Sequence, residues 1–217
     1  MTGRATDTVV LDLYEAGMTA APVERAAMLN AAAGGAADAL LGAVDRRLWT
    51  WLAGRFSGPF DAVATCSACG AGMEFSLPEG FDIPGKDNAL VEVRHGKRSY
   101  DIRMPRLADL RAGGLDPMVL CPEAPWEKAT FRKKAEAALE TADPGLRITL
   151  SLECGACGAA QAPVFDVGAF VWGHVESAAQ RLIRDVAVLA RAFGWSESEI
   201  AAMSPARRAL YLREIAE

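Results

Sequence analysis

The chain has 217 residues, of which 51% are hydrophobic and 24% are charged, a composition typical of a folded protein and not of a disordered one. Its 28 acidic residues outnumber its 23 lysines and arginines, so the formal net charge at pH 7 is −5. This balance argues against a dedicated binder of duplex DNA, which needs a basic face to neutralise phosphates.

The N-terminal region, residues 1–58, is predicted to be helical. Apolar residues share one face around residues 9–14, and Pro22 suits the first turn of a second helix. A third helix is expected over residues 36–56, where apolar residues recur at helical spacing: Leu40, Leu41, Val44, Leu48 and Leu52. The N-terminus lacks the uninterrupted apolar run of a signal peptide, so we expect a protein kept in a reducing cytoplasm.

Residues 59–166 are predicted to form an antiparallel β unit that contains an insertion, about residues 80–145. Alternating apolar residues indicate strands over residues 60–65, 73–77, 146–153 and 162–165. Within the insertion we expect a hairpin of strands 90–93 and 99–104, joined by His95-Gly96-Lys97, and helices over 106–112 and 126–141.

The C-terminal region, residues 167–217, is predicted to be helical again. A long helix is expected over residues 167–193, and two short helices follow. Their starts are indicated by a capping box of Ser196 and Glu199, and by Ser204-Pro205. The apolar stretch 165–172 is far shorter than the ~20 residues of a membrane span, so we expect no membrane partner.

Two cysteine pairs are near copies of each other. Cys66-Ser-Ala-Cys69 and Cys154-Gly-Ala-Cys157 each have two intervening residues, a following glycine and an expected strand on either side. Two residues between thiolates let one turn, a zinc knuckle, present both sulfurs to a single metal ion. Together the pairs supply a closed tetrahedral set. The sequence therefore predicts one structural zinc ion held by Cys66, Cys69, Cys154 and Cys157.

The separation of the two knuckles is unusual. The 84 residues from 70 to 153 far exceed the ~15–20 residues of a compact zinc ribbon. Because the entropy of loop closure grows only logarithmically with length, joining distant knuckles costs little more once the inserted part folds. We therefore predict an α+β fold: a zinc-ribbon-like antiparallel β unit with a long insertion, flanked by N-terminal and C-terminal helices.

Other interpretations of the cysteines stay open. A redox dithiol usually begins a helix after a strand, whereas both pairs here lie between expected strands. Disulfide bonds are rare in a reducing cytoplasm. Cys121 lies alone before Pro122, and its ordinary interpretation is a small thiol that is buried or partly exposed.

Candidate catalytic residues are scarce. His95 lies in an expected hairpin turn and His174 on the edge of the expected long helix, and neither has an obvious cysteine or serine partner. The sequence contains no nucleophile elbow, Walker loop or dinucleotide fingerprint. We therefore expect a protein that is not an enzyme and has no small-molecule substrate.

The most specific motif lies near the C-terminus. It reads Leu189-Ala-Arg-Ala-Phe-Gly-Trp195-Ser-Glu-Ser-Glu-Ile200 and continues through Ser204-Pro-Ala-Arg-Arg208 to Tyr211-Leu212. With both cysteine pairs and the block Phe56-x-Gly-x-Phe60, it resembles the baseplate proteins of contractile-tailed phages and extracellular contractile injection systems. That family is grouped with the T-even phage baseplate hub and its assembly chaperones. Residues 80–125 carry little of its pattern.

The resemblance implies a role in tail morphogenesis, as a structural component of the baseplate or as a factor that assists its assembly. The partners it implies are other baseplate, hub or spike proteins of a contractile tail, in the producing bacterial cell or in the assembled particle. The alternative function is a zinc-ribbon adaptor or regulator that binds nucleic acid, against which the low basic charge argues.

Overall fold

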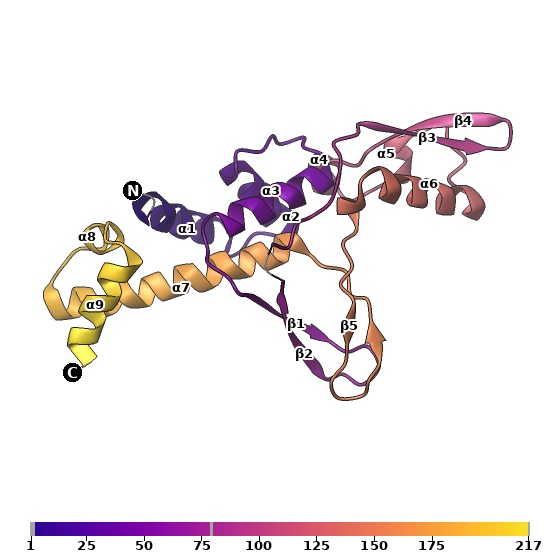
Figure 1. Ribbon diagram of the computed structural model, residues 1–217. Coiled ribbons are helices and arrows are strands. Elements are labelled where there is room, and N and C mark those ends of the chain that lie inside the picture. Colours follow the sequence, from indigo (N-terminus) through magenta and orange to yellow (C-terminus); the bar gives the residue numbers. More distant parts are fainter. Residues whose placement is uncertain (1–2, 79, 217) are drawn as a thin grey trace.

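The computed structural model describes residues 3–78 and 80–216, and it shows the predicted mixed α+β class. Helices from both ends of the chain pack together (Figure 1): α1 (Gly3–Gly17), α2 (Pro22–Ala32), α3 (Leu41–Ala53) and α7 (Val167–Phe193). We call these four elements the helical body. Strands and further helices leave the body between α3 and α7 and return to it (Figure 1).

The core of the helical body consists of the apolar faces that helical spacing predicts. On α3, Val44, Leu48 and Leu52 lie about one turn apart, and all three are buried. They belong to a large cluster that also contains Trp49, Trp51, Val171, Trp172 and Val175. Burying one such side chain is worth roughly 1.5–3 kcal/mol relative to exposure, so burial of this cluster is a large stabilising contribution to the body.

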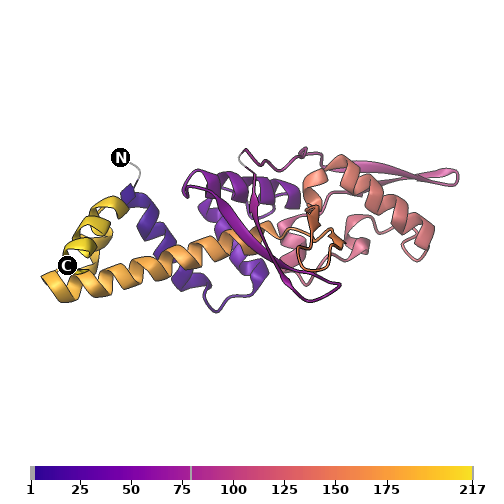
Figure 2. The same cartoon turned by 60° about the horizontal axis from the view of Figure 1, so that its bottom comes forward.

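Two short helices, α8 (Glu197–Ala201) and α9 (Pro205–Ala216), pack against the far end of α7 (Figure 2). The predicted capping box at the start of α8 is confirmed. The hydroxyl of Ser196 accepts a hydrogen bond from the N–H of Glu199, whose carboxylate accepts one from the N–H of Ser196. The ring of Trp195 stacks on Phe193 and meets Tyr211 edge-on, with centroid distances of 4.5 and 4.8 Å.

The cysteines lie on two hairpins that extend from the helical body (Figure 1), which we call the cysteine arm (residues 60–77 and 148–165). In the first hairpin, β1 (Phe60–Thr65) and β2 (Gly72–Leu77) pair antiparallel over six residue pairs. In the second, β5 (Leu152–Glu153) and β6 (Ala160–Gln161) pair over two. Each hairpin is a separate two-stranded sheet in the described part of the chain.

The second hairpin is less regular than the sequence predicts. Alternation of apolar residues predicts a strand over 146–153, but η1 (Pro144–Leu146) is a 3-10 turn and regular pairing begins at Leu152. The return strand is β6 and does not cover residues 162–165. Proline explains the interruption, because Pro163 has no N–H to donate and joins the opposite strand through its carbonyl, which accepts from the N–H of Leu150.

Two helix predictions also need correction, and one short helix was missed. The third helix begins at Leu41 and not at residue 36, because the preceding residues pair with the insertion: Leu107 donates its N–H to the carbonyl of Ala39. The helix predicted from residue 126 is α6 (Ala129–Ala142), which begins three residues later. The four-residue helix α5 (Pro117–Leu120) was not predicted.

The insertion has an apolar core of its own. β3 (Leu90–His95) and β4 (Arg98–Arg103) form the predicted hairpin, and Gly96 adopts a φ of +63° at its turn. The helix α6 packs on this hairpin. The side chains buried between them and the neighbouring loop include Val93, Ile102, Leu120, Phe131 and Ala135.

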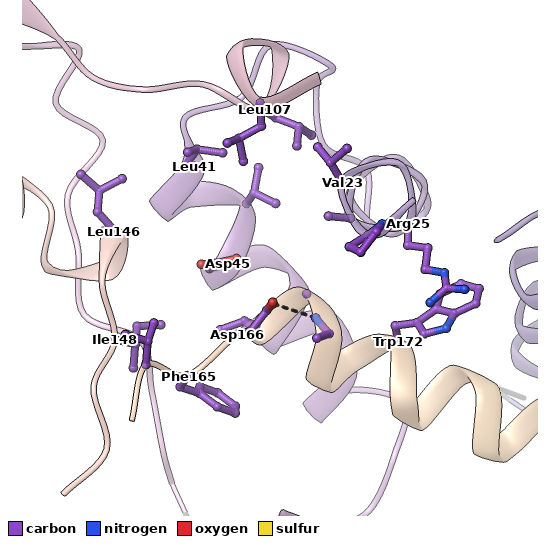
Figure 3. A pocket seen from close by; sticks show the side chains of 18 residues that line it. Val23, Arg25, Leu41, Asp45, Leu107, Leu146, Ile148, Phe165, Asp166 and Trp172 are labelled. Carbon is purple, nitrogen blue, oxygen red and sulfur yellow. Dashed lines mark hydrogen bonds between the residues drawn. The ribbon is translucent and has the colours of Figure 1, made fainter. Parts of the chain in front are cut away.

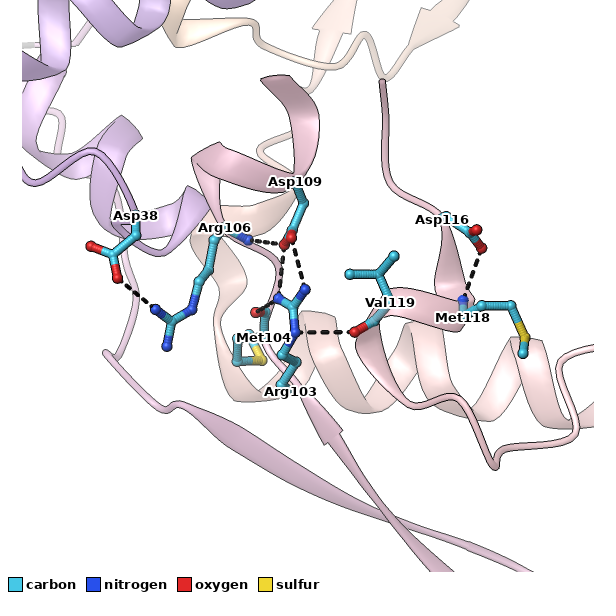
Figure 4. A network of polar contacts seen from close by, with 8 residues as sticks. All are labelled: Asp38, Arg103, Met104, Arg106, Asp109, Asp116, Met118 and Val119. Atoms are coloured by element: carbon cyan, nitrogen blue, oxygen red, sulfur yellow. Dashed lines mark hydrogen bonds and ion pairs between the residues drawn. The ribbon is translucent and has the colours of Figure 1, made fainter. Parts of the chain in front are cut away.

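A polar network connects the insertion to the helical body through α4 (Leu107–Arg111) (Figure 4). The carboxylate of Asp109 accepts two hydrogen bonds from the guanidinium of Arg103, at 2.8 and 2.7 Å, and one from the N–H of Arg106 at 2.8 Å. These bonds, above all those from Arg103, lower the pKa of Asp109. The guanidinium of Arg106 in turn pairs with Asp38 at 2.8 Å, just before α3.

Arg46 of α3 holds both ends of the insertion. Its guanidinium donates to Asp143 at 2.8 Å, where the insertion ends, and to Asp87, where it begins. The side chain of Asp143 is 1% exposed, and one of its oxygens also accepts the N–H of Gly145 at 3.0 Å. The insertion is therefore attached by a largely buried ion pair.

None of the helices within residues 3–78 and 80–216 combines the length and the apolar character that crossing a bilayer requires.

The division of the chain into three regions, with boundaries at residues 58 and 166, stays a prediction.

Candidate metal centre

The four cysteines named by the sequence pattern meet in the cysteine arm. The sulfur of Cys66 lies 3.8 Å from that of Cys157, and the sulfur of Cys69 lies 3.7 Å from that of Cys154. All four sulfurs lie within 4.8 Å of one another. Both short contacts run between the two hairpins, so the cluster joins segments that are far apart in the sequence. Across the described ranges, no second group of three or more cysteine, histidine or acidic side chains gathers this closely.

The sulfur separations fit a metal ion. In a tetrahedron with metal–sulfur bonds of about 2.3 Å, neighbouring sulfurs lie about 3.8 Å apart. A disulfide would bring two sulfurs to about 2.05 Å, and all of these cysteines are free thiols. The cluster therefore has the dimensions of a four-thiolate metal site and not those of two disulfide bonds.

Both knuckles have the same backbone geometry. In the first, the N–H of Gly70 donates to the carbonyl of Cys66 at 2.9 Å, and the N–H of Cys66 donates to the carbonyl of Ala71 at 2.9 Å. The second knuckle repeats the two bonds at 2.8 and 3.0 Å, with Gly158 and Cys154 as donors. Gly70 and Gly158 have φ values of +76° and +71°, a region that glycine enters without steric cost. Each glycine thus lets the turn close behind its cysteines.

A polar contact joins one knuckle to the other. The backbone N–H and the hydroxyl of Ser67 both donate to the side-chain oxygen of Gln161, at 3.2 and 2.8 Å. The apolar cluster of the arm includes two of the cysteines themselves. Its three buried residues are Cys66, Met73 and Cys154. Two of the three are metal-ligand candidates, so few purely apolar side chains hold the hairpins together.

The electrostatics of the cluster favour a cation. Hydrogen bonds from the backbone N–H groups of Cys157 and Ala156 lower the pKa of Cys154 to about 7. At Cys157 the N–H of Ala159 also lowers the pKa, but the neighbouring Cys69 and Cys154 outweigh it and raise the pKa to about 12. The knuckle turns thus stabilise the first thiolate that forms, whereas the neighbouring cysteines oppose the deprotonation of the last thiol. A divalent cation among the sulfurs removes this conflict, because metal binding deprotonates its thiol ligands.

The remaining cysteine and both histidines lie elsewhere. Cys121 is buried in the core of the insertion, and burial raises the pKa of its thiol. His95 packs edge-on against Phe131. His174 is half-buried, burial lowers its pKa, and its ring packs against three others: Phe56, Phe60 and Phe170. The two histidines are thus partners of aromatic rings, a role that their expected positions in a surface turn and on a helix edge do not reveal.

Gln161 is a residue of the site that the sequence pattern did not reveal. It follows the second knuckle in β6, but its partner Ser67 lies 94 residues away, so no local signal links the two. The one hint in the sequence is that a polar side chain, Gln161, lies close after the second knuckle, just before an expected strand.

Comparisons with protein-family models, with curated proteins and with solved structures find no match for this chain. The geometry of the cysteine cluster is therefore the main structural basis for a proposal of function.

Proposed function

We propose that the four clustered cysteines bind one Zn²⁺ ion in a zinc-ribbon-like arrangement, and that this ion is structural. The observation that carries the proposal is the pair of sulfur contacts between the hairpins, at 3.7 and 3.8 Å. Four thiolates complete a tetrahedral coordination shell and leave no position for water or substrate. Tetrahedral sites of four soft sulfur ligands suit zinc or iron, and a structural role in cross-linking hairpins favours redox-inert zinc.

We propose further that the protein is not an enzyme and acts by contact with other proteins. A closed metal site offers no Lewis-acid position, and both histidines pack on aromatic rings instead of facing a nucleophile. The elongated arrangement of helical body, insertion and cysteine arm offers several separate surfaces (Figure 1). These features suit a component that holds other proteins in place.

The partners that we propose are baseplate, hub or spike proteins of a contractile tail. The support for this assignment is the resemblance of residues 189–212 and of the two knuckles to baseplate proteins. In the structure that C-terminal motif forms the end of α7 with α8 and α9, at the opposite end of the body from the insertion (Figure 2). Its aromatic group leaves part of Phe193 exposed, which is a feature suited to a contact surface.

Affinity purification of the tagged full-length chain from producing cells tests this proposal. Identification of co-purifying proteins, from assembly intermediates and from mature particles separately, is expected to recover baseplate components. Recovery from intermediates alone indicates an assembly factor, and recovery from both indicates a structural component. Absence of tail proteins from both fractions contradicts the proposal, and DNA binding that weakens steeply with salt favours the nucleic-acid alternative instead.

A further inference from the structure

A cavity of about 490 Å³ lies where the helical body, the insertion and the base of the cysteine arm meet (Figure 3). Its wall is formed by α2, α3, α4, the first turns of α7 and the chain around residues 146–148 and 164–166. Most of the lining is apolar and includes Val23, Leu41, Leu107, Ile148, Phe165 and Trp172. This volume lies within the range of about 300–1,000 Å³ that is common for ligand sites.

One acidic side chain projects into this cavity. Asp45 extends from α3 toward the space between the apolar residues (Figure 3), and it is half-buried. Within the described residues it takes part in no hydrogen bond or ion pair. Burial, and then the nearby carboxylate of Asp166, raise the pKa of Asp45 to about 7. A half-buried carboxylate without a partner is costly, and a bound donor would remove that cost.

The other charged groups of the lining are already engaged. The guanidinium of Arg25 donates to the carbonyls of Gly17 and Met18, at 2.8 and 2.9 Å, and lies over the ring of Trp172 at 4.7 Å. Asp166 caps α7 by accepting the N–H of Ala169 at 2.8 Å, as the dashed line in Figure 3 shows. The carboxylate of Asp45 is thus available to a ligand that enters the cavity.

We propose that this cavity binds a lysine side chain presented by a partner protein, with its stem between the apolar walls and its ammonium group against Asp45. A lysine stem of four methylene groups matches apolar walls, and its compact charge matches a single carboxylate. An arginine fork can also pair with the two oxygens of one carboxylate, as Arg103 does with Asp109, so the comparison with butylguanidinium in the test below decides between the two cations. The inference rests on the proposed function in one respect, namely that the lysine comes from a protein.

The test uses pentylammonium as a probe of the lysine side chain, titrated into the zinc-loaded full-length chain at pH 8 and followed by NMR. Its neutral, acidic and forked counterparts are 1-pentanol, pentanoate and butylguanidinium. Pentylammonium is expected to bind at least about 10-fold more tightly than 1-pentanol, because a hydrogen bond between charged groups is stronger than one between neutral groups. The amide signals of Val23, Ala169 and Trp172 are expected to shift.

Three variants locate the site. Asp45→Asn is expected to abolish the preference for pentylammonium, whereas Asp101→Asn, at an exposed carboxylate of β4, keeps it. Ala169→Leu adds a larger side chain at an exposed position of the lining and is expected to weaken binding of pentylammonium and 1-pentanol alike.

The dependence on pH gives a measurement that needs no variant. Protonation of Asp45 removes its charge, so the preference for pentylammonium over 1-pentanol is expected to fall between pH 8 and pH 6. The other charged groups near Asp45 are Asp166 just before α7, Asp143 before η1, Arg46 of α3 and, across the cavity, Arg25 of α2.

Equal binding of pentylammonium and 1-pentanol overturns the inference, as does a preference for butylguanidinium or an unchanged preference in Asp45→Asn. If Asp45→Asn does not fold, the pH series on the unmodified chain decides. If the probes do not bind, but zinc is present and its removal still opens the arm, this inference alone is rejected. Absence of zinc from the protein rejects the proposed function instead.

Discussion

The helical body and the cysteine arm are stabilised in different ways. The body buries a large apolar cluster that includes three tryptophans and the inner faces of α3 and α7. The arm's own apolar cluster buries three side chains, and two of these are cysteines, whereas Leu77 and Phe165 at the base of the arm are buried in the core of the body. Apolar burial thus accounts for the body, whereas the arm has too small a core and needs a cross-link. The comparison supports the proposal that a metal ion organises the arm, and it predicts that the body folds without one.

The two hairpins of the arm repeat this contrast on a smaller scale. The first has a ladder of six residue pairs, and the second has two, with one further bridge between Thr149 and Val164. Their knuckles have the same backbone hydrogen bonds. The turn geometry therefore does not depend on the length of the ladder, and the second hairpin should depend more on the metal.

The largest expected effect is that of Cys154→Ser, which removes one thiolate. Structural zinc binding contributes on the order of 10 kcal/mol to the folding of small metal domains, so the variant should lose zinc and open the second hairpin. Hydrogen exchange should show fast exchange in residues 148–165, slower exchange in β1 and β2, and unchanged protection in α3 and α7. Cys121→Ser, in the core of the insertion, is the control and should keep its zinc. Unchanged metal content in Cys154→Ser would falsify the assignment.

Arg46→Met tests the connection between the body and the insertion. It leaves the buried Asp143 without its cation, a loss that costs about 3–5 kcal/mol when a buried pair is broken. Urea unfolding should show this loss of stability while zinc stays bound. Arg106→Met is the matched control: its pair with Asp38 is exposed and should contribute no more than about 1 kcal/mol. Equal effects of the two substitutions would show that burial of Asp143 does not matter.

Leu48→Ala creates a cavity in the helical body. Leu48 is fully buried, so the free energy of unfolding should fall by about 2–5 kcal/mol. If the body folds without the metal, the loss should be the same with zinc bound and after chelation. A larger loss in the chelated protein would mean that the metal supports the body as well as the arm.

The smallest expected effect is that of Ser196→Ala at the start of α8. Loss of this cap costs about 1 kcal/mol and should be confined to α8 and α9, with no change in zinc content. Thermal unfolding and hydrogen exchange measure it. Glu197→Gln, in the same turn but outside the cap, should change the stability less.

The features that local sequence fixes were predictable. Two residues between cysteines, followed by glycine, determine the knuckle turn, and the helical spacing of Val44, Leu48 and Leu52 determines the buried face of α3. The structure brings the two knuckles together as the pairing of their motifs predicts. These predictions needed no knowledge of contacts between distant segments.

The features that depend on distant contacts were not predictable. Arg46 and Asp143 are 97 residues apart, and each has a sequence context that an exposed charge would share. The apolar alternation of Ile148 and Leu150 predicts a strand, but these side chains pack against the core of the helical body without a regular ladder. Period-two alternation is the same in a regularly paired strand and in this irregular segment, because it reports which side chains are buried and not which backbone groups are paired.

The metal content of the untagged protein tests the central claim most directly. Elemental analysis combined with X-ray absorption at the zinc edge should find one zinc ion per chain, bound by four sulfur ligands at about 2.3 Å. Protein that contains no zinc, or zinc bound by nitrogen or oxygen in place of these sulfurs, would contradict the claim that the two hairpins are joined by a single metal ion.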